Sequence, residues 1–364
     1  MIRFLHAADF HLDSAFSALP PRQAASRRRE SRELLARLAE YVNRQDIDLV
    51  LLPGDLLDST RPFRETVEAL AEVLGRMKAR VFIAPGNHDP YLPGSLWQTV
   101  EWPENVHVFR GNALQAVEVP ELNAVVYGAA FVGKEQSRSL LAGFSAPRDG
   151  RVHIGVLHGE VEAAEERYDP LRREEIEACG LDYLALGHIH KRTAPLRYGR
   201  TLCAWPGCLE GHGFDETGEK GYYQGTISPT GVEVTFVPFA RRRYEILEVD
   251  VTGQPPLAAV EAALPPDTEN DLYRIRLVGE TGEGGVALDE LRDGLAHRFY
   301  ALELQDHTRM AEDVWARCGE DSLRGLFLQE LKKKWDAATD EATRQQVTQA
   351  ARFGLAALDH REMG

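Results

Sequence analysis

Apolar and polar positions in the first two thirds of the chain switch between strand-like and helix-like spacing. Short apolar runs predict strands at 2–8, 48–52 and 81–84, and the second of these is typical of a strand buried on both faces. Apolar residues recur at helical spacing over 21–44 and 62–78. The pattern therefore predicts consecutive βα units.

After about residue 105 the expected strands follow one another closely, at 106–109, 124–128, 152–157, 183–186, 201–205, 221–227 and 232–237. Such a mixture of βα units and a later meander predicts two packed sheets with helices outside them. From about residue 241 a second segment begins, with strands at 244–249 and 273–278 and a helix at 286–298. The portion 321–358 is helical throughout.

Composition and charge narrow the classes of protein. The chain has 364 residues, of which 43% are hydrophobic and 27% charged, so it is globular and not a disordered or collagenous chain. No apolar run approaches the roughly 18–20 residues that span a bilayer. Four cysteines without Cys-x-x-Cys spacing and a start unlike a signal peptide predict reduced thiols in the cytoplasm.

The formal net charge is -15, which argues against a protein that binds nucleic acid by bulk electrostatics. An anionic substrate would have to be attracted locally, by metal ions or by small basic clusters. The clusters that the sequence offers for this role are Arg27–Arg29 and Arg241–Arg243.

Polar side chains gather where the predicted strands end. They are Asp9 and His11 after the first strand, Asp55 after the second, Asn87, His88 and Asp89 after the third, His158 after 152–157, and His188 and His190 after 183–186. In α/β sheets, sites form beyond the carboxyl ends of the strands. Carboxylate, amide and imidazole ligands together suit Mn, Fe or Zn better than Ca or Mg. Seven such ligands can hold two metals that act on a phosphoryl group.

Each piece alone has an ordinary interpretation. A lone Asp-x-His is usually a surface feature, Gly-Asp after a strand is more often a turn, and a single His is more often a hydrogen-bonded structural residue. Gly-Asn-His-Asp and Gly-His-x-His are more specific, because a plain turn needs no imidazole. Five groups in this order, each at a strand end, favour one metal site.

In this order Asp9-x-His11, Gly54-Asp55, Gly86-Asn87-His88-Asp89, His158-Gly159 and Gly187-His188-x-His190 resemble the signature of calcineurin-like metallophosphoesterases. Further stretches resemble SbcD-type DNA repair exonucleases, in particular the bacterial YhaO-like branch; they are 6–14, 181–190, 206–208 and 214–221. The resemblance implies an α/β fold: a four-layer αββα sandwich over 1–240, a smaller capping-like α/β domain over 241–320 and a helical tail over 321–364.

The resemblance also implies which residues bind metal. One ion would be held by Asp9, His11, Asp55 and His190, and the other by Asp55, Asn87, His158 and His188, with Asp55 bridging. Manganese is the metal it implies first, with iron or zinc as alternatives. His88 would face the phosphate and protonate the leaving oxygen. Asp89 would orient His88.

Two further residues are candidates for neighbours of the ligands or for substrate contacts. Some related nucleases carry a His three residues after the bridging Asp, where it supports the catalytic His. In this chain Asp58 takes that position. His212, in a Gly-His-Gly loop, is the second candidate.

The function implied by the resemblance is a manganese-dependent DNA phosphodiesterase that acts in DNA repair. It would be a 3′-to-5′ double-strand exonuclease with single-strand endonuclease action, would work with an SbcC-like ATPase, and would form a homodimer. One alternative is the same chemistry on small phosphodiesters or nucleotides, which the acidic net charge favours. The other is a non-catalytic scaffold subunit, which we would expect to have lost metal ligands.

Overall fold

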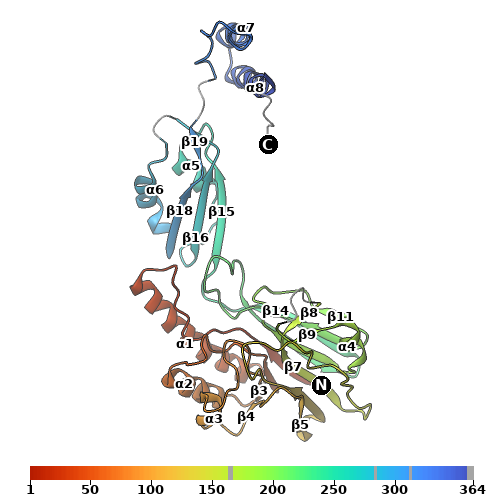
Figure 1. Ribbon diagram of the computed structural model, residues 1–364. Coiled ribbons are helices and arrows are strands. Elements are labelled where there is room, and N and C mark those ends of the chain that lie inside the picture. The colour runs from red at the N-terminus through yellow and green to blue at the C-terminus, as the bar shows by residue number, and fades with distance from the viewer. Residues whose placement is uncertain (163–166, 283–284, 311–313, 359–364) are drawn as a thin grey trace. The chain divides into compact units, whose positions relative to one another are not determined.

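The computed structural model describes residues 1–162, 167–282, 285–310 and 314–358 (Figure 1). The chain divides into two compact units, which are described separately. The first unit consists of Met1–Leu247, Leu264–Ile275 and Arg292–Leu304, and the second of Glu248–Ala263, Arg276–Leu291 and Gln305–Gly364. The boundaries expected from the sequence, 1–240, 241–320 and 321–364, stay a prediction.

The first unit contains a six-stranded mixed sheet with the order β14-β13-β1-β2-β3-β4. Its strands are β1 (Ile2–His6), β2 (Leu49–Leu52), β3 (Arg80–Ile83), β4 (Val106–Val108), β13 (Gly221–Ser228) and β14 (Gly231–Pro238). β1 to β4 run parallel, whereas β13 is antiparallel to β1 and to β14. The parallel strands therefore end at one edge of the sheet.

A second six-stranded sheet has the order β11-β12-β10-β7-β6-β5. Its strands are β5 (Gln115–Val119), β6 (Ala124–Gly128), β7 (Val152–His158), β10 (Tyr183–Gly187), β11 (Leu196–Tyr198) and β12 (Thr201–Ala204). The four central strands are parallel, and the two edge strands β5 and β11 are antiparallel to their neighbours. The sequence predicted the central strands but not the two edge strands, whose side chains are largely half-buried or exposed.

Alternating side chains of the strands enter different hydrophobic layers. In β2, Leu49 and Leu51 pack in the core between the sheets, while Val50 and Leu52 face the helices. β10 alternates in the same way between the inter-sheet core and an outer layer. Because successive side chains of a strand point to opposite faces, this division shows two sheets packed face to face. Helices cover them, which confirms the predicted αββα architecture.

The helices of this unit cover the outer faces of the two sheets (Figure 1). They are α1 (Pro21–Arg44), α2 (Arg64–Gly75), α3 (Leu96–Thr99) and α4 (Arg173–Ala178). α1 begins at a proline in its first turn, where the missing N–H costs no helical hydrogen bond. Its buried face carries Leu34, Leu35, Leu38 and Val42, which pack on the first sheet with α2. The sequence predicted α1 and α2 but not the short α3 and α4.

The remaining elements form a smaller α/β region and a helical end. A three-stranded sheet has the order β15-β16-β18, with β15 (Tyr244–Asp250), β16 (Leu272–Val278) and β18 (Ala301–Asp306). The short pair of β17 (Glu280–Thr281) with β19 (Arg309–Met310) belongs to this region, whereas the short pair of β8 (Glu160–Val161) with β9 (Pro170–Leu171) belongs to the first unit. The last helices are α5 (Pro256–Ala263), α6 (Leu288–Leu295), α7 (Leu323–Ala337) and α8 (Glu341–Leu358). Leu328 of α7 packs on Ala351 of α8.

Two more findings bear on the predicted organisation. The predicted helix at 286–298 is shorter, because its last turn is the 3-10 helix Ala296–Arg298. The helical tail is confirmed as two helices. Among the described residues, no helix has the length and apolar character needed to cross a bilayer.

Candidate metal centre

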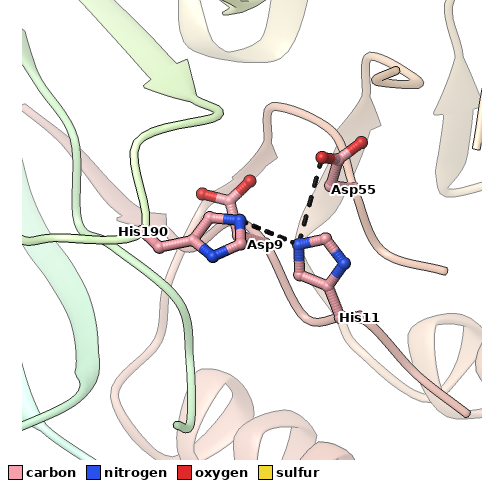
Figure 2. A group of neighbouring side chains, drawn as sticks. All are labelled: Asp9, His11, Asp55 and His190. Carbon is pink, nitrogen blue, oxygen red and sulfur yellow. Dashed lines mark hydrogen bonds and ion pairs between the residues drawn. The ribbon is translucent and has the colours of Figure 1, made fainter. Parts of the chain in front are cut away.

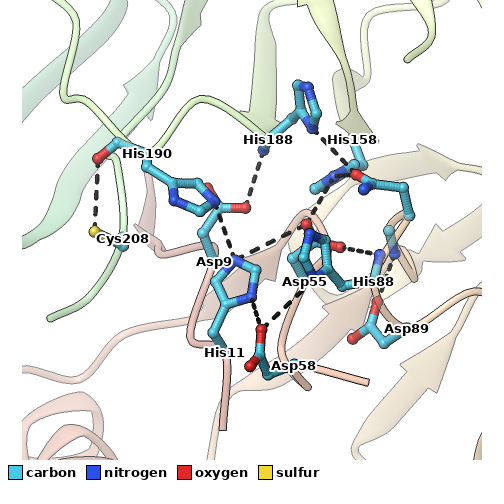
Figure 3. Close-up of polar contacts among 12 residues, drawn as sticks. Asp9, His11, Asp55, Asp58, His88, Asp89, His158, His188, His190 and Cys208 are labelled. Atoms are coloured by element: carbon cyan, nitrogen blue, oxygen red, sulfur yellow. Dashed lines mark hydrogen bonds and ion pairs between the residues drawn. The ribbon is translucent and has the colours of Figure 1, made fainter. Parts of the chain in front are cut away.

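The polar side chains at the strand ends converge on one place in the first unit (Figure 3). β1, β2 and β3 are parallel neighbours in one sheet, and β7 and β10 are parallel neighbours in the other. Their carboxyl ends therefore lie together at one edge of each sheet. His158 is the last residue of β7, and the backbone N–H of His188 donates to the Asp9 carboxylate across the two sheets (3.0 Å). The predicted residues thus form a single cluster.

Three glycines of the motifs are explained by how closely these loops approach one another. A Cβ atom on Gly54 would collide with the His158 ring, and one on Gly86 would collide with Asp55. A Cβ atom on Gly187 would collide with the backbone oxygen of Pro53. The glycines therefore allow the ends of the two sheets to touch at the candidate site.

Several of the polar residues adopt the left-handed backbone region, which is costly for residues other than glycine. The φ angles are 53° at Asp9, 42° at His11, 51° at Asp55 and 88° at His188. Such conformations cluster at functional sites, where the surrounding structure holds them. Here they turn each side chain off its strand and toward the shared centre.

One group of side chains consists of Asp9, His11, Asp55 and His190, whose ligand atoms all lie within 4.8 Å of one another (Figure 2). Nε2 of His11 lies 3.0 Å from Nε2 of His190 and 3.9 Å from the Asp55 carboxylate. The Oδ2 atom of Asp9 is buried and has no hydrogen-bond partner among the described residues. Two facing imidazole nitrogens beside a buried, unpaired carboxylate oxygen suit a cation.

A second group consists of Asp55, His158 and His188 (Figure 3). The side-chain amide of Asn87 lies beside both imidazoles of this group. The Asn87 side-chain oxygen lies 2.8 Å from Nε2 of His158 and 3.1 Å from Nδ1 of His188. Nε2 of His158 is 3.3 Å from the Asp55 carboxylate. Asp55 therefore belongs to both groups, in the place of a bridge between two metal positions.

The outward-facing nitrogen of each imidazole has an oxygen partner. The partner is Asp58 for His11 (3.1 Å), Glu216 for His190 (2.5 Å), Glu160 for His188 (2.8 Å) and the Pro53 carbonyl for His158 (2.9 Å). A carboxylate or carbonyl oxygen only accepts hydrogen bonds, so the neutral ring keeps its proton on that side. Each inward nitrogen is then left with a lone pair, as a metal ligand requires. The donor set fits two divalent ions.

Charges within the cluster shift the pKa values of its members. Burial alone would raise the pKa of Asp55, but nearby His158 and His11 outweigh it and hold this pKa below its ordinary value. Burial opposes the charge on His158, yet Asp55 and Asp9 raise its pKa to about 9. Burial, and then the charge of His158, lowers the pKa of His188 to about 3. The charge of Asp55 therefore acts on several imidazoles of the cluster at once.

His88 lies at the open edge of the cluster, with 44% of its side chain exposed. Its backbone N–H donates to the Asp55 carboxylate (2.9 Å), which fixes the residue while the ring stays accessible. Nδ1 of the ring is 3.5 Å from the Asp58 carboxylate, and this contact raises the pKa of His88. Asp58 thus contacts both His11 and His88, as Figure 3 shows.

The carboxylate of Asp89 is held by backbone N–H groups. Its Oδ1 accepts from the backbone N–H of Gly86 (2.8 Å), and its Oδ2 accepts from those of Leu56 (2.8 Å) and Leu57 (3.1 Å). It therefore ties the loop after β2 to the loop after β3. The expectation that Asp89 orients the His88 ring stays a prediction; the carboxylate that contacts this ring in the structure belongs to Asp58.

His212 lies beside the first group and not within it. Its ring centroid is 5.8 Å from that of His11, and both its backbone N–H and its Nδ1 face Glu216, at 2.7 and 3.2 Å. Sequence reasoning missed Glu216 and also Glu160. Glu160 follows His158 by two residues, a spacing that places both side chains on one side of an extended segment. No spacing links Glu216 to His190.

One arginine of each cluster is buried and does not contribute to the positive surface that the sequence suggested. Arg27 is 1% exposed and pairs with Glu30 and Glu210, at 2.7 Å each. Arg242 is buried and pairs with the same Glu30 (2.7 Å). Arg27 and Arg242 therefore belong to one buried network of ion pairs that includes Glu30. Arg29 and Arg32 remain exposed on α1.

The fold and the paired His/Asp clusters define a metal-dependent phosphoesterase. The family model for calcineurin-like phosphoesterases matches residues 2–192, which is more than half of the chain. The chain belongs to this family.

Three relatives illustrate the range of its similarity. The chain is 32% identical over 268 residues to the uncharacterized metallophosphoesterase YhaO of Bacillus subtilis, a match that covers 69% of this chain and 64% of that protein. It is 24% identical to the DNA double-strand break repair protein Mre11 of Methanopyrus kandleri, over 70% of this chain and 60% of that protein. Identity to a subunit of the SbcCD nuclease of Staphylococcus epidermidis is 23%, over 68% of this chain and 73% of that protein. The chain thus spans less than two thirds of the first two relatives.

Proposed function

We propose that this protein is a manganese-dependent DNA phosphodiesterase with two metal ions. In this proposal it removes nucleotides from double-stranded DNA in the 3′-to-5′ direction, cleaves single strands internally, and works with an SbcC-like ATPase. The observation that carries the proposal is the convergence of seven ligand-type side chains in two groups that share Asp55.

The assignment of ligands follows these two groups. Asp9, His11, Asp55 and His190 would hold one ion, and Asp55, Asn87, His158 and His188 would hold the other. When bound, the two ions neutralise charge on the phosphoryl oxygens and supply the nucleophile from water at neutral pH. The complete set of ligands speaks against a non-catalytic scaffold, in which ligands would be lost.

His88 is the candidate general acid. Its ring is exposed at the edge of the cluster, while its backbone is held by Asp55. The contact with Asp58 raises the pKa of His88, which favours the protonated form of the ring. A proton at this position can pass to the leaving sugar oxygen, which is the role of a general acid.

The DNA part of the proposal is supported by the relatives named as a DNA double-strand break repair protein and as a subunit of a nuclease. The second of these names describes one subunit of a nuclease, which supports a partner subunit for this chain. That this partner is an SbcC-like ATPase follows from the sequence resemblance alone. Both similarities are below 25% identity, so the substrate and the partner are proposals. The same holds for the choice of manganese.

One specific observation favours a second candidate, a phosphodiesterase for small substrates. The net charge is -15, and Arg27 and Arg242 form buried ion pairs, so they are not available to bind phosphate groups. A long DNA footprint would need several phosphate contacts from cationic side chains. A small phosphodiester would need only the metal centre and His88.

The test compares a linear duplex labelled at its 3′ ends with a small chromogenic phosphodiester, both in the presence of Mn²⁺. We expect the wild-type chain to release the label from the duplex and His88→Ala to release it much more slowly. Turnover of the chromogenic substrate without cleavage of the duplex, with or without an ATPase partner, would favour the second candidate. No turnover of either substrate would contradict both.

A further inference from the structure

Two glutamates that are not among the candidate ligands contact the imidazoles of His190 and His188. Oε1 of Glu216 lies 2.5 Å from Nδ1 of His190, and Oε1 of Glu160 lies 2.8 Å from Nε2 of His188. In both rings the other nitrogen faces the candidate ligands: Nε2 of His190 faces His11, and Nδ1 of His188 faces Asn87. Each glutamate therefore contacts the back of one candidate ligand.

Glu216 is held firmly in this position. Its side chain is 8% exposed, and its second oxygen accepts from the backbone N–H of His212 (2.7 Å) and lies 3.2 Å from Nδ1 of the same residue. The carboxylate thus bridges the loop at 211–216 and His190. A buried carboxylate with these contacts fixes the His190 ring in one orientation.

Glu160 is held by a different part of the chain. It belongs to β8, which pairs with β9, and its backbone N–H donates to the carbonyl of Tyr168 (3.2 Å). The ring of Tyr168 packs against that of His188, with 4.5 Å between the centroids. His188 is therefore contacted by two side chains, those of Glu160 and Tyr168, that follow β7 in the chain.

A carboxylate behind a metal-binding imidazole has two effects. It fixes which nitrogen carries the proton, and it raises the basicity of the nitrogen that faces the metal. We propose that Glu216 and Glu160 are positioning residues, one for each metal position: Glu216 acts through His190, and Glu160 acts through His188. This rests on the two-metal part of the proposed function and is independent of the substrate.

A merely structural role predicts a different outcome. If the two glutamates only held their loops in place, their removal would lower the stability of the fold without changing the affinity for one particular ion. The proposal instead requires that each substitution weaken one metal position, and that this effect depend on the imidazole through which the glutamate acts.

The experiment titrates the full, metal-free chain with Mn²⁺ by calorimetry and repeats the titration with Co²⁺, whose absorption reports its ligands. Glu216→Gln and Glu160→Gln are compared with the wild type, and Glu219→Gln is the matched control, because Glu219 is exposed on the same loop as Glu216. We expect two ions in the wild type. Each of the first two variants should bind one ion about 10- to 100-fold more weakly, and the control should not change.

Double variants assign each effect to a position. Adding Glu216→Gln to His190→Ala should weaken metal binding no further, whereas adding it to His188→Ala should weaken the remaining ion. Adding Glu160→Gln to His188→Ala should weaken metal binding no further, whereas adding it to His190→Ala should weaken the remaining ion. Two side chains that act through one another give such non-additive effects, and independent ones do not.

Three outcomes would overturn the proposal. Glu216→Gln and Glu160→Gln could bind both ions with wild-type affinity, or either substitution could weaken both ions equally. In the third outcome, the effect of a glutamate substitution on metal affinity would simply add to the effect of replacing the histidine that this glutamate contacts. If Glu216→Gln does not fold, Glu160→Gln carries the test, because 29% of that side chain is exposed. A wild-type chain that binds no divalent ion would instead contradict the proposed function itself.

Discussion

The deep part of the candidate site and its open edge are built in different ways. Asp9, Asp55, Asp89 and His158 are almost fully buried, and backbone groups hold most of them, such as the Pro53 carbonyl behind His158. At the edge, His88 and His190 are 44% and 36% exposed, and side-chain carboxylates hold them. The deep part is therefore fixed by the folding of the strands. The edge depends on individual charged residues from separate loops.

This difference has a consequence for catalysis. Deep residues cannot change without disturbing both sheets, so a substitution there should affect metal binding, activity and often stability together. Edge residues can change with little effect on the fold, so their effects on metal binding and on the reaction can be separated.

Asp55→Asn should have the largest effect, because Asp55 belongs to both ligand groups. Loss of the bridging charge removes several kcal/mol of stabilisation from the transition state, a decrease of about a thousandfold or more in phosphodiester hydrolysis. The measurement is kcat/KM on the chromogenic substrate with saturating Mn²⁺. Metal-dependent activity near that of the wild type would show that the site is assigned wrongly.

His88→Ala should lower kcat by roughly a hundredfold or more, which is typical for the loss of a general acid. Because His88 is not among the proposed ligands, the number of bound ions should stay the same, in contrast to Asp55→Asn. His297→Ala is the control, since His297 is exposed and far along the sequence from the motifs. Loss of an ion from His88→Ala would remove the distinction between the deep part and the edge.

Gly187→Ala should lower stability, because the new Cβ atom would collide with the backbone oxygen of Pro53, which directly follows β2 of the other sheet. Overpacking of this kind typically costs about 1–3 kcal/mol of unfolding free energy. Gly133→Ala is the matched control, because its Cβ atom would meet open space. The measurement is chemical unfolding of the metal-free chains. Equal stability of the two variants would show that the sheets do not approach here as described.

Asp169 gives the smallest effect, and it depends on pH. Burial raises the pKa of this carboxyl group from 3.8 to about 7. A raised pKa means that the folded chain binds the proton more tightly than the unfolded chain, so stability falls as the pH rises toward and through 7. Between pH 6 and pH 8 the loss amounts to about 1 kcal/mol.

The test of this effect is the difference in stability between Asp169→Asn and the wild type. Asn has no ionisable group, so the variant should gain in relative stability by this amount when the unfolding experiment moves from pH 6 to pH 8. A difference that does not change between the two pH values would contradict the raised pKa.

The contrast between the deep part of the site and its open edge also explains which residues could be predicted from the sequence. The ligands lie at strand ends within short motifs, so the apolar runs before Asp9, Asp55 and His188 indicated their places. The two edge strands β5 and β11 were missed, because half-buried strands carry a weak apolar signal. The backbone amides that donate to the Asp89 carboxylate could not be predicted either, since they belong to the loops after two different strands.

The residues of the open edge were the hardest to predict. Glu216 is separated from His190 by 26 positions, and no periodic pattern connects the two.

The burial of Arg27 could not be predicted from the sequence either. This residue lies in a run of three arginines that resembles an exposed basic patch, yet it pairs with Glu210 from a distant loop. Such contacts arise from the tertiary fold, so they become visible only when the loops are placed in space.

The most direct test of the central claim is the number of divalent ions that the purified full chain binds at equilibrium. Mn²⁺ is titrated into the metal-free protein, and bound metal is measured after dialysis, with Asp55→Asn treated in parallel. We expect two ions per wild-type chain and fewer in the variant. A wild-type chain that binds none, or a variant that binds two with unchanged affinity, would contradict the claim that the strand ends form a two-metal centre.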